Sequence, residues 1–224
     1  MPSLRKKHRQ HSQSVSPHEL QIQLEKLTSA LPFSLPEGSV DSYVTFIQLL
    51  DKWNAVYNLT SVRDVRQMVS RHILDSLVVY PFLQGKQILD VGCGAGLPGI
   101  PLAIADPQKQ FTLLDSNQKK TRFVQQAITE LQLDNVTVVN ERVENYHAEH
   151  TFDTVVARAY SAIDNLIAGV EQLLADDVTI LAMKGTYPVA ELENIPEMFK
   201  VEDVASLHVP GLDADRHLVI LRRS

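Results

Sequence analysis

Glycines and acidic residues gather in one stretch of the sequence, residues 88–120, in a pattern that suits nucleotide binding. The glycines can be read in two phases. Gly94-x-Gly96-x-x-Gly99 fits the loop that holds the pyrophosphate of NAD. The other phase, Asp90-x-Gly92-x-Gly94-x-Gly96, places an acidic residue before three alternating glycines. The choice between the phases decides which ligand the protein holds.

The second phase accounts for more of the residues. A predicted strand, 87–91, ends directly before Gly92, so the NAD phase leaves Gly92 and Cys93 unexplained. Asp90 would repel a pyrophosphate but suits a cation or an amine. Asp115 ends the next strand and can accept both hydroxyls of a ribose in either phase. S-adenosylmethionine carries a ribose, an ammonium and a sulfonium but no phosphate, so the residues favour a methyltransferase over a dinucleotide enzyme or a non-catalytic binding loop.

Three cations follow later strands of the same predicted sheet. Arg142, Arg158 and Lys184 come after the third, fourth and fifth strands, so we expect them to point toward one mouth and to act on the substrate. Arginine and lysine match the O6 and N7 acceptors of guanine and also bind phosphate. The alternative for each is a surface ion pair with a nearby carboxylate.

The elements that position these residues alternate between strands and helices from about residue 84, which predicts an α/β fold with a mostly parallel sheet. Strands are expected at 87–91, 111–115, 136–140, 154–157, 178–183, 200–207 and 217–222, and helices at 99–105, 118–131, 162–174 and 189–195. The short link between the last two strands predicts an antiparallel pair at a sheet edge. We divide the chain into a basic disordered tail (1–16), an N-terminal helical extension (17–83) and a methyltransferase domain (84–224).

The extension reads as three helices, with Ser16 as the N-cap of the first, a second from Ser39 and a third over about 64–80. His72 is interpreted as a hydrogen-bonded residue of the third helix, with the entrance for RNA as its alternative. Asn58 is expected to cap the second helix, and Cys93 to be a small loop residue. No metal site is expected, because the histidines lack suitable spacing.

Composition limits the classes of protein. The chain has 224 residues, 44% hydrophobic and 21% charged, with a net charge of −6 and a single cysteine. These values are typical of a globular protein in a reducing compartment, and no apolar run reaches the ~20 residues of a membrane span. We therefore expect a cytoplasmic protein. The acidic balance argues against a general nucleic-acid binder, so any RNA affinity needs a local basic surface.

Beyond these arguments, the sequence resembles a known family over about residues 40–222. The resemblance lies in Trp53–Arg63, Arg71–Ser76, Asp90–Pro101, Thr112–Ser116, Glu141–Glu144, Val156–Ala159, Met183–Gly185 and Asp215–Leu218. These motifs are similar to those of the bacterial small-subunit (16S) ribosomal RNA guanine-N7-methyltransferase G family, also called glucose-inhibited division protein B.

The resemblance implies a class I S-adenosylmethionine-dependent methyltransferase fold: a Rossmann-like, mostly parallel seven-stranded sheet with an antiparallel last strand. It implies N7 methylation of one guanine in 16S ribosomal RNA, free or within the small ribosomal subunit, by a protein we expect to be a monomer. Cofactor contacts carried over by position are Gly92, Leu97, Val143, Glu144 and Arg158, to which the layout adds Asp90, Gly94, Asp115 and Ser116. The alternatives are a methyltransferase for another substrate and a non-catalytic module that binds ribosomal RNA or assists its assembly.

Overall fold

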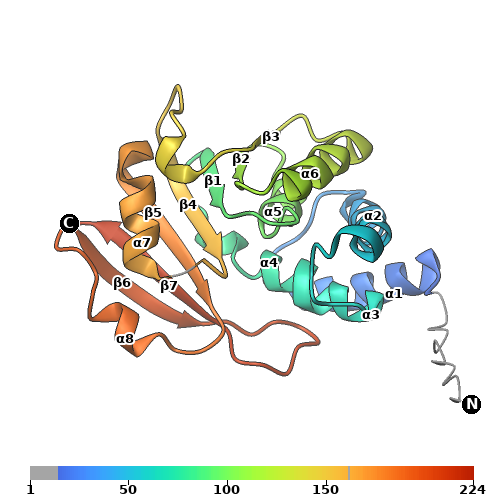
Figure 1. Cartoon of the computed structure of the whole chain (residues 1–224). Helices are drawn as coiled ribbons and strands as arrows, with labels where there is room; N and C mark the ends of the chain where they lie inside the picture. The colour runs from blue at the N-terminus through green and yellow to red at the C-terminus, as the bar shows by residue number, and fades with distance from the viewer. Residues whose placement is uncertain (1–14, 161) are drawn as a thin grey trace, which may run out of the picture.

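The computed structural model describes residues 15–160 and 162–224, which fold around one seven-stranded sheet (Figure 1). The predicted basic tail lies almost wholly outside the described residues. The strands are β1 (Gln87–Val91), β2 (Gln110–Leu114), β3 (Val136–Val139), β4 (Phe152–Arg158), β5 (Leu174–Lys184), β6 (Phe199–Ser206) and β7 (His217–Arg223). Each predicted strand is present, and most bounds differ from the prediction by one or two residues.

The strand order is β3-β2-β1-β4-β5-β7-β6. Strands β1 to β5 are parallel, whereas β7 runs antiparallel to both β5 and β6. This confirms the prediction of five parallel strands closed by an antiparallel pair at one edge. The order reverses between β1 and β4, and in open sheets of this kind ligands bind beyond the carboxyl ends of the strands at such a reversal.

The helices cover both faces of the sheet. They are α1 (Pro17–Thr28), α2 (Ser39–Tyr57), α3 (Val65–Met68), α4 (Asp75–Leu77), α5 (Gly99–Ala105), α6 (Gln118–Leu131), α7 (Ile163–Val170) and α8 (Val189–Leu192), with a π-helical segment at Val69–Leu74 between α3 and α4. The predicted helix 162–174 was too long. A 3₁₀ turn follows α7, and Leu174 already belongs to β5, where it pairs with Phe152 and is buried.

Two apolar cores lie on the two sides of the sheet, because successive strand residues face opposite sides. In β5, Leu181 packs into the core that also contains residues of α1, α2, α5 and α6, whereas Ile180 packs with α7. Figure 1 shows this arrangement, with α1, α2 and α3 on the side opposite to α7 and α8. The N-terminal helices therefore share a core with the sheet. Their treatment as a separate extension stays a prediction.

The helix termini follow the local signals in the sequence. Ser16 accepts a hydrogen bond from the backbone N–H of Glu19 at 3.2 Å, and the Glu19 carboxylate accepts one from the N–H of Ser16 at 2.8 Å, so α1 begins with the expected cap. Asn58 ends α2 in the left-handed conformation (φ 52°), which confirms its predicted role as a cap.

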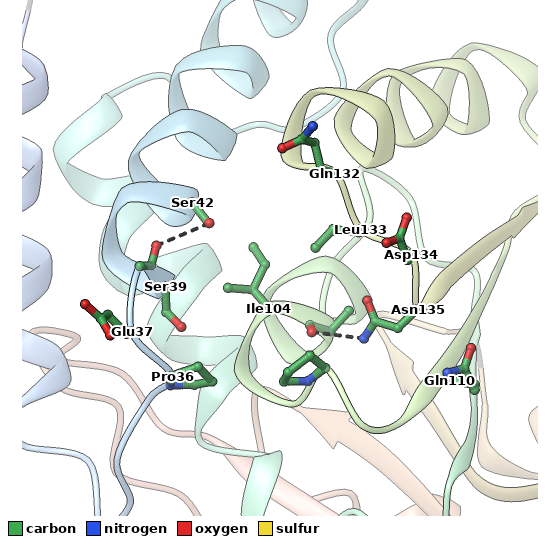
Figure 2. A pocket seen from close by; sticks show the side chains of 13 residues that line it. Pro36, Glu37, Ser39, Ser42, Ile104, Gln110, Gln132, Leu133, Asp134 and Asn135 are labelled. Atoms are coloured by element: carbon green, nitrogen blue, oxygen red, sulfur yellow. Dashed lines mark hydrogen bonds between the residues drawn. The ribbon is translucent and has the colours of Figure 1, made fainter.

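A cavity of about 490 Å³ lies at the amino edge of the sheet, between the start of α2 and the turn before β3 (Figure 2). Gln110 at the start of β2 and Asn135 just before β3 both line it. Among the described residues, the charged side chains that line it are the acidic Glu37 and Asp134. This cavity is therefore remote from the carboxyl edge, where the topology predicts the ligand. No helix within the described residues is long and apolar enough to cross a membrane.

Candidate active site

The glycine loop after β1 adopts the phase that begins at Asp90. Gly92, Gly94 and Gly96 have φ angles of 69°, 58° and 74°, in the left-handed region that favours glycine. Gly99 is different, because a Cβ added there would lie 2.7 Å from Leu113 Cγ. Gly99 is thus the residue at which α5 packs closely on β2, and the first three glycines form the turn.

Asp90 lies inside the protein beneath this loop. Its side chain is fully buried, and Oδ2 accepts a hydrogen bond from the backbone N–H of Gly99 at 2.8 Å. Oδ1 has no partner in the described part of the chain. Burial raises the pKa of Asp90 to about 7, and the Gly99 N–H and the charge of Arg158 oppose this rise. Asp90 anchors the first turn of α5. The predicted contact with the amine of a ligand stays a prediction.

Asp115 ties the end of β2 to the same loop. Its Oδ2 accepts a hydrogen bond from the N–H of Gly94 at 2.9 Å, and its Oδ1 accepts one from the N–H of Asn117 at 2.8 Å. Lys120 Nζ lies 3.9 Å from Oδ2. An ionised carboxylate has about four acceptor positions, so two remain for the hydroxyls of a ligand.

A cavity of about 330 Å³ opens where these residues meet, and we name it the glycine-loop cavity. Its wall includes Gly92, Asp115, Ser116, Arg142, Val143, Glu144, Arg158, Ala159 and Tyr160. Six of the nine predicted cofactor residues therefore lie around one cavity. The other three lie behind it: Asp90 and Leu97 are buried, and Gly94 forms the turn.

A second cavity of about 430 Å³ adjoins the first, and we name it the arginine cavity. Its wall includes Thr60, Arg71, His72, Asp75, Arg158, Ala159, Tyr160, Lys184 and Arg216. The two cavities share the successive residues Arg158, Ala159 and Tyr160. Ala159 has a φ of 55°, which is uncommon for a residue with a Cβ and is found where a site holds the backbone in a strained form.

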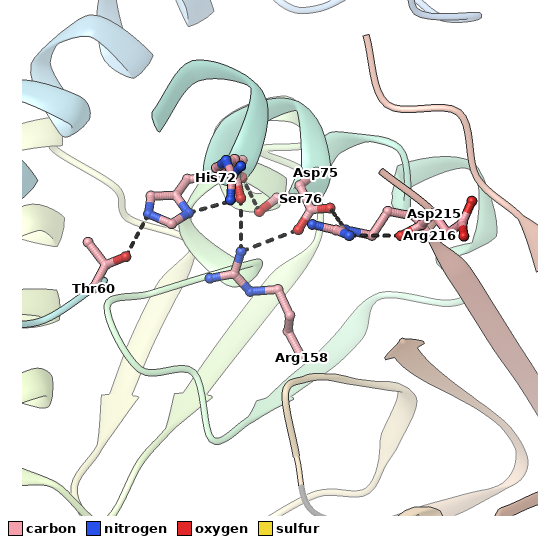
Figure 3. Close-up of polar contacts among 8 residues, drawn as sticks. Thr60, His72, Asp75, Ser76, Arg158, Asp215 and Arg216 are labelled. Carbon is pink, nitrogen blue, oxygen red and sulfur yellow. Dashed lines mark hydrogen bonds and ion pairs between the residues drawn. The ribbon is translucent and has the colours of Figure 1, made fainter. Parts of the chain in front are cut away.

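Asp75 joins two arginines from distant parts of the chain (Figure 3). Arg158 Nη1 lies 3.4 Å from its Oδ2, and Arg216 Nε lies 2.6 Å from its Oδ1. The Asp75 side chain is 5% exposed, and those of Arg158 and Arg216 are 23% and 24% exposed. A buried carboxylate needs such partners, since an unpaired buried charge is strongly destabilising. Burial lowers the pKa of Arg158, and the carboxylate of Asp75 opposes this shift. An arginine side chain keeps its positive charge in a protein.

His72 lines the same cavity as a neutral side chain. Its Nδ1 lies 2.9 Å from the carbonyl oxygen of Arg71, which can only accept, so Nδ1 carries the proton. Nε2 then accepts a hydrogen bond from the hydroxyl of Thr60, also at 2.9 Å. Burial, together with the positive charge of Arg158, lowers the pKa of His72 to about 4. The prediction of a hydrogen-bonded helix residue is confirmed, and its ring also faces the arginine cavity.

The three cations predicted to share one mouth lie along two adjoining cavities. Arg142 is exposed and lines only the glycine-loop cavity, and Lys184 lines only the arginine cavity. Lys184 Nζ lies 2.7 Å from Glu191 Oε2, which also accepts the N–H of Ile163. Lys184 thus forms the ion pair that was the alternative expectation. Arg158 alone belongs to both cavities.

Sequence reasoning gave no role in the site to Thr60, Asp75 or Arg216. Asp75 and Arg216 are 141 residues apart in the chain, and no local pattern joins them. Both lie in stretches that carry the family resemblance, which was the available signal. Cys93 is buried within the loop, and burial raises the pKa of its thiol, so it is no thiolate nucleophile and its interpretation as a small loop residue is supported.

Sequence comparison places the chain among known proteins. Residues 40–219 match the family model described as rRNA small subunit methyltransferase G. A ribosomal RNA small subunit methyltransferase G from Idiomarina loihiensis is 46% identical over 201 residues, which cover 90% of this chain and 98% of that protein. A protein of the same name from Nitrosococcus oceani is 49% identical over 199 residues, covering 89% of this chain and 93% of its own.

Solved structures share the fold at much lower identity. A magnesium protoporphyrin IX methyltransferase from Synechocystis PCC 6803, with bound SAM, superposes with a TM-score of 0.54 and 19% identity over 87% of this chain and all of that chain. A ribosomal protein L11 methylase from Lactobacillus delbrueckii subsp. bulgaricus gives a TM-score of 0.54 at 15% identity over 67% of this chain and 77% of its own.

Proposed function

The chain belongs to the rRNA small subunit methyltransferase G family, and we propose that it methylates N7 of one guanine in the 16S ribosomal RNA, with S-adenosylmethionine as the methyl donor. The observation that supports this most directly is the pair of adjoining cavities at the carboxyl edge of the sheet. One is built from the glycine loop and a carboxylate, and the other is rich in cations.

The glycine-loop cavity fits the methyl donor. Gly92 lines this cavity and leaves free the space that a side chain would fill, since a Cβ there would lie 3.4 Å from Tyr160 Cδ2, which is also in the wall. Asp115 keeps acceptor positions for ribose hydroxyls, and Val143 offers an apolar contact to a base. When bound, S-adenosylmethionine supplies a methyl group activated by its sulfonium. The absence of phosphate from this ligand agrees with the nearby carboxylates of Asp115 and Glu144.

N7 of guanine has an in-plane lone pair and carries no proton, so its methylation needs no general base. The work of this chain is then to hold the base in line with the donor at a separation of ~3–3.5 Å. A neutral His72 and a paired Asp75 agree with this, because neither is arranged to remove a proton from the substrate.

Mass mapping of small-subunit ribosomal RNA tests the proposal. We expect RNA from cells without this gene to lack one N7-methylguanine, and the purified protein with S-adenosylmethionine to restore it. An identical methylation map with and without the gene would contradict the RNA substrate. A modification that is lost but not restored by the protein would favour an assembly role.

We further propose that the protein acts as a cytoplasmic monomer. The single cysteine suits a reducing compartment, and the two cavities are built from one chain. Light scattering coupled to size-exclusion chromatography should give a mass near that of one chain. A stable dimer would contradict this.

A further inference from the structure

Hydrogen-bond donors dominate the arginine cavity. Four cationic side chains line it, from Arg71, Arg158, Lys184 and Arg216; Asp75 is the carboxylate among the lining residues, and Lys184 is already paired with Glu191. His72 is neutral above its pKa of about 4 and adds no charge. Both Asp75 oxygens already accept an arginine. A ligand of this cavity therefore needs acceptor atoms, in a protein whose net charge is −6.

The two inner arginines keep donors for such a ligand. Arg158 makes its contacts to Asp75 and to the Arg71 carbonyl through Nη1 alone. Arg216 uses Nε toward Asp75 and Nη1 toward the carbonyl of Asp215. Within residues 15–160 and 162–224, Nη2 of each arginine makes no hydrogen bond. Asp75 therefore fixes the two guanidinium groups and leaves at least one donor group of each without a partner among the described residues (Figure 3).

The location of the cavity limits what these donors can meet. Methyl transfer requires the acceptor atom to approach the donor to ~3–3.5 Å, so the acceptor site must adjoin the glycine-loop cavity. The arginine cavity does so through Arg158, Ala159 and Tyr160, whereas the cavity near Asn135 shares none of these residues.

Building on the proposed function, we propose that the arginine cavity receives the target guanine, that Arg216 and Arg158 donate to its O6, and that Asp75 is the positioning residue for both. O6 is the acceptor next to N7, so a donor there orients N7 without occupying it. Adenine carries an amino group at the same position. The amino group of adenine and the N–H groups of the arginines would then face each other, with no acceptor between them. Leaving these buried donors unpaired costs free energy, and adenine is therefore excluded.

A phosphate of the RNA backbone could also accept hydrogen bonds from these arginines. An analogue of guanine that lacks O6 distinguishes the base from the phosphate. The probe is ribosomal RNA ligated from two transcripts, with guanine or 2-aminopurine at the position that mass mapping identifies. 2-Aminopurine keeps N7 and lacks O6. Single-turnover transfer of labelled methyl groups is measured for the wild type and for Arg216→Met, with circular dichroism to confirm folding.

We expect 2-aminopurine to slow the wild type about 10- to 100-fold and Arg216→Met to slow transfer to guanine by a similar factor. On 2-aminopurine the substitution should cost less than about threefold, because the O6 contact is already absent. Arg222→Met is the matched control: this arginine lies on β7, the strand that follows Arg216, and pairs with Glu202 at 2.9 Å, outside the cavity. Its rates should equal those of the wild type on both bases.

Asp75→Asn tests the positioning role. We expect it to lower the transfer rate on guanine about tenfold, to weaken the binding of S-adenosylhomocysteine by a smaller factor, and to cost much less when added to Arg216→Met. Equal losses for Arg216→Met on guanine and 2-aminopurine would mean that the arginines hold a phosphate, and would overturn the base pocket alone. A wild-type protein that leaves guanine RNA unmodified would overturn the proposed function together with the pocket.

Discussion

Asp90 should make the stability of this protein depend on pH in an unusual direction. Its carboxyl is fully buried beneath the glycine loop and has one partnered oxygen. The pKa is about 7 in the folded protein, against an ordinary value of 3.8 that the unfolded chain is expected to show. The folded state therefore binds the proton more tightly. The favourable contribution of this group is complete below pH 3.8 and is lost as pH rises through 7.

The size of the effect follows from the two pKa values. Their difference corresponds to about 4 kcal/mol when the carboxyl is ionised in both states. About 1.4 kcal/mol of this falls between pH 6 and pH 8.5, because the unfolded chain is already ionised at pH 6 while the folded protein is mostly protonated. Asp90→Asn keeps the shape and cannot ionise. Its free energy of unfolding, relative to the wild type, should rise by about 1.4 kcal/mol over that range.

Urea unfolding followed by circular dichroism at pH 6, 7 and 8.5 measures this difference. Any constant offset from burying the amide cancels, since only the change with pH is compared. Thr112→Val serves as the control, because Thr112 is a buried, non-titrating residue of the adjacent β2, so its difference from the wild type should be flat. A flat difference for Asp90→Asn as well would refute the reasoning and mean that the carboxyl is solvated or paired in solution.

Four further outcomes follow from the site. Asp115→Ala should weaken binding of S-adenosylmethionine by about 1–3 kcal/mol in calorimetry, through lost hydrogen bonds to a charged acceptor, and unchanged affinity would remove it from the site. Gly94→Val should abolish that binding with a nearly native circular dichroism spectrum, because a φ of 58° is strained for a branched residue and its side chain would occupy the open space beside the glycine loop. Arg142→Ala should reduce the salt slope of RNA binding by up to about one unit, and the equally exposed Arg122→Ala on α6 should not. His72→Gln should remove an acid-sensitive component of stability: with a folded pKa of about 4, the wild-type histidine destabilises the protein as pH falls from 6.5 toward 4, and parallel pH curves for the two proteins would contradict this.

Strands and helices could be predicted well because their signals are local. The bounds of β1, α5 and α6 match the predictions, since each has regular apolar spacing flanked by glycine, proline or an N-cap. The error at 171–177 has the same origin: apolar residues at 173 and 174 continue a helical spacing, but the pairing of Leu174 with Phe152 draws the segment into β5. Long-range pairing overrode a local preference there.

The site was predicted less completely because successive side chains of a strand point to opposite faces of the sheet, so a shift of one residue changes which face a side chain occupies. Ile88 and Asp90 face one side of β1, and Leu89 faces the other, so Asp90 turns into the core beside α5. In the same way Arg158 pairs in register with Met183, and Lys184, one residue further, turns to the opposite side toward Glu191. Lys184 still lines the arginine cavity beside Arg158, whereas Arg142 lines only the glycine-loop cavity, so residues that follow strands at one edge need not share a cavity.

The N-terminal helices and loops provide the part of the arginine cavity that the sheet does not. The strand ends provide the donor cavity and Arg158, but a lone guanidinium on a flexible side chain would hold a base loosely. The π-helical segment and the residue after it bring His72 and Asp75 to the same cavity, and Thr60 from the preceding loop fixes the ring. Asp75 then holds the guanidinium of Arg158, at the end of β4, through an ion pair. It also pairs with Arg216, which lies in the link between β6 and β7. Three segments far apart in the sequence must therefore be folded before the acceptor side exists, whereas the glycine-loop cavity needs β1, β2, β4 and the segment after β3. Damage to the extension is then expected to affect methyl transfer to RNA more than it affects binding of the methyl donor.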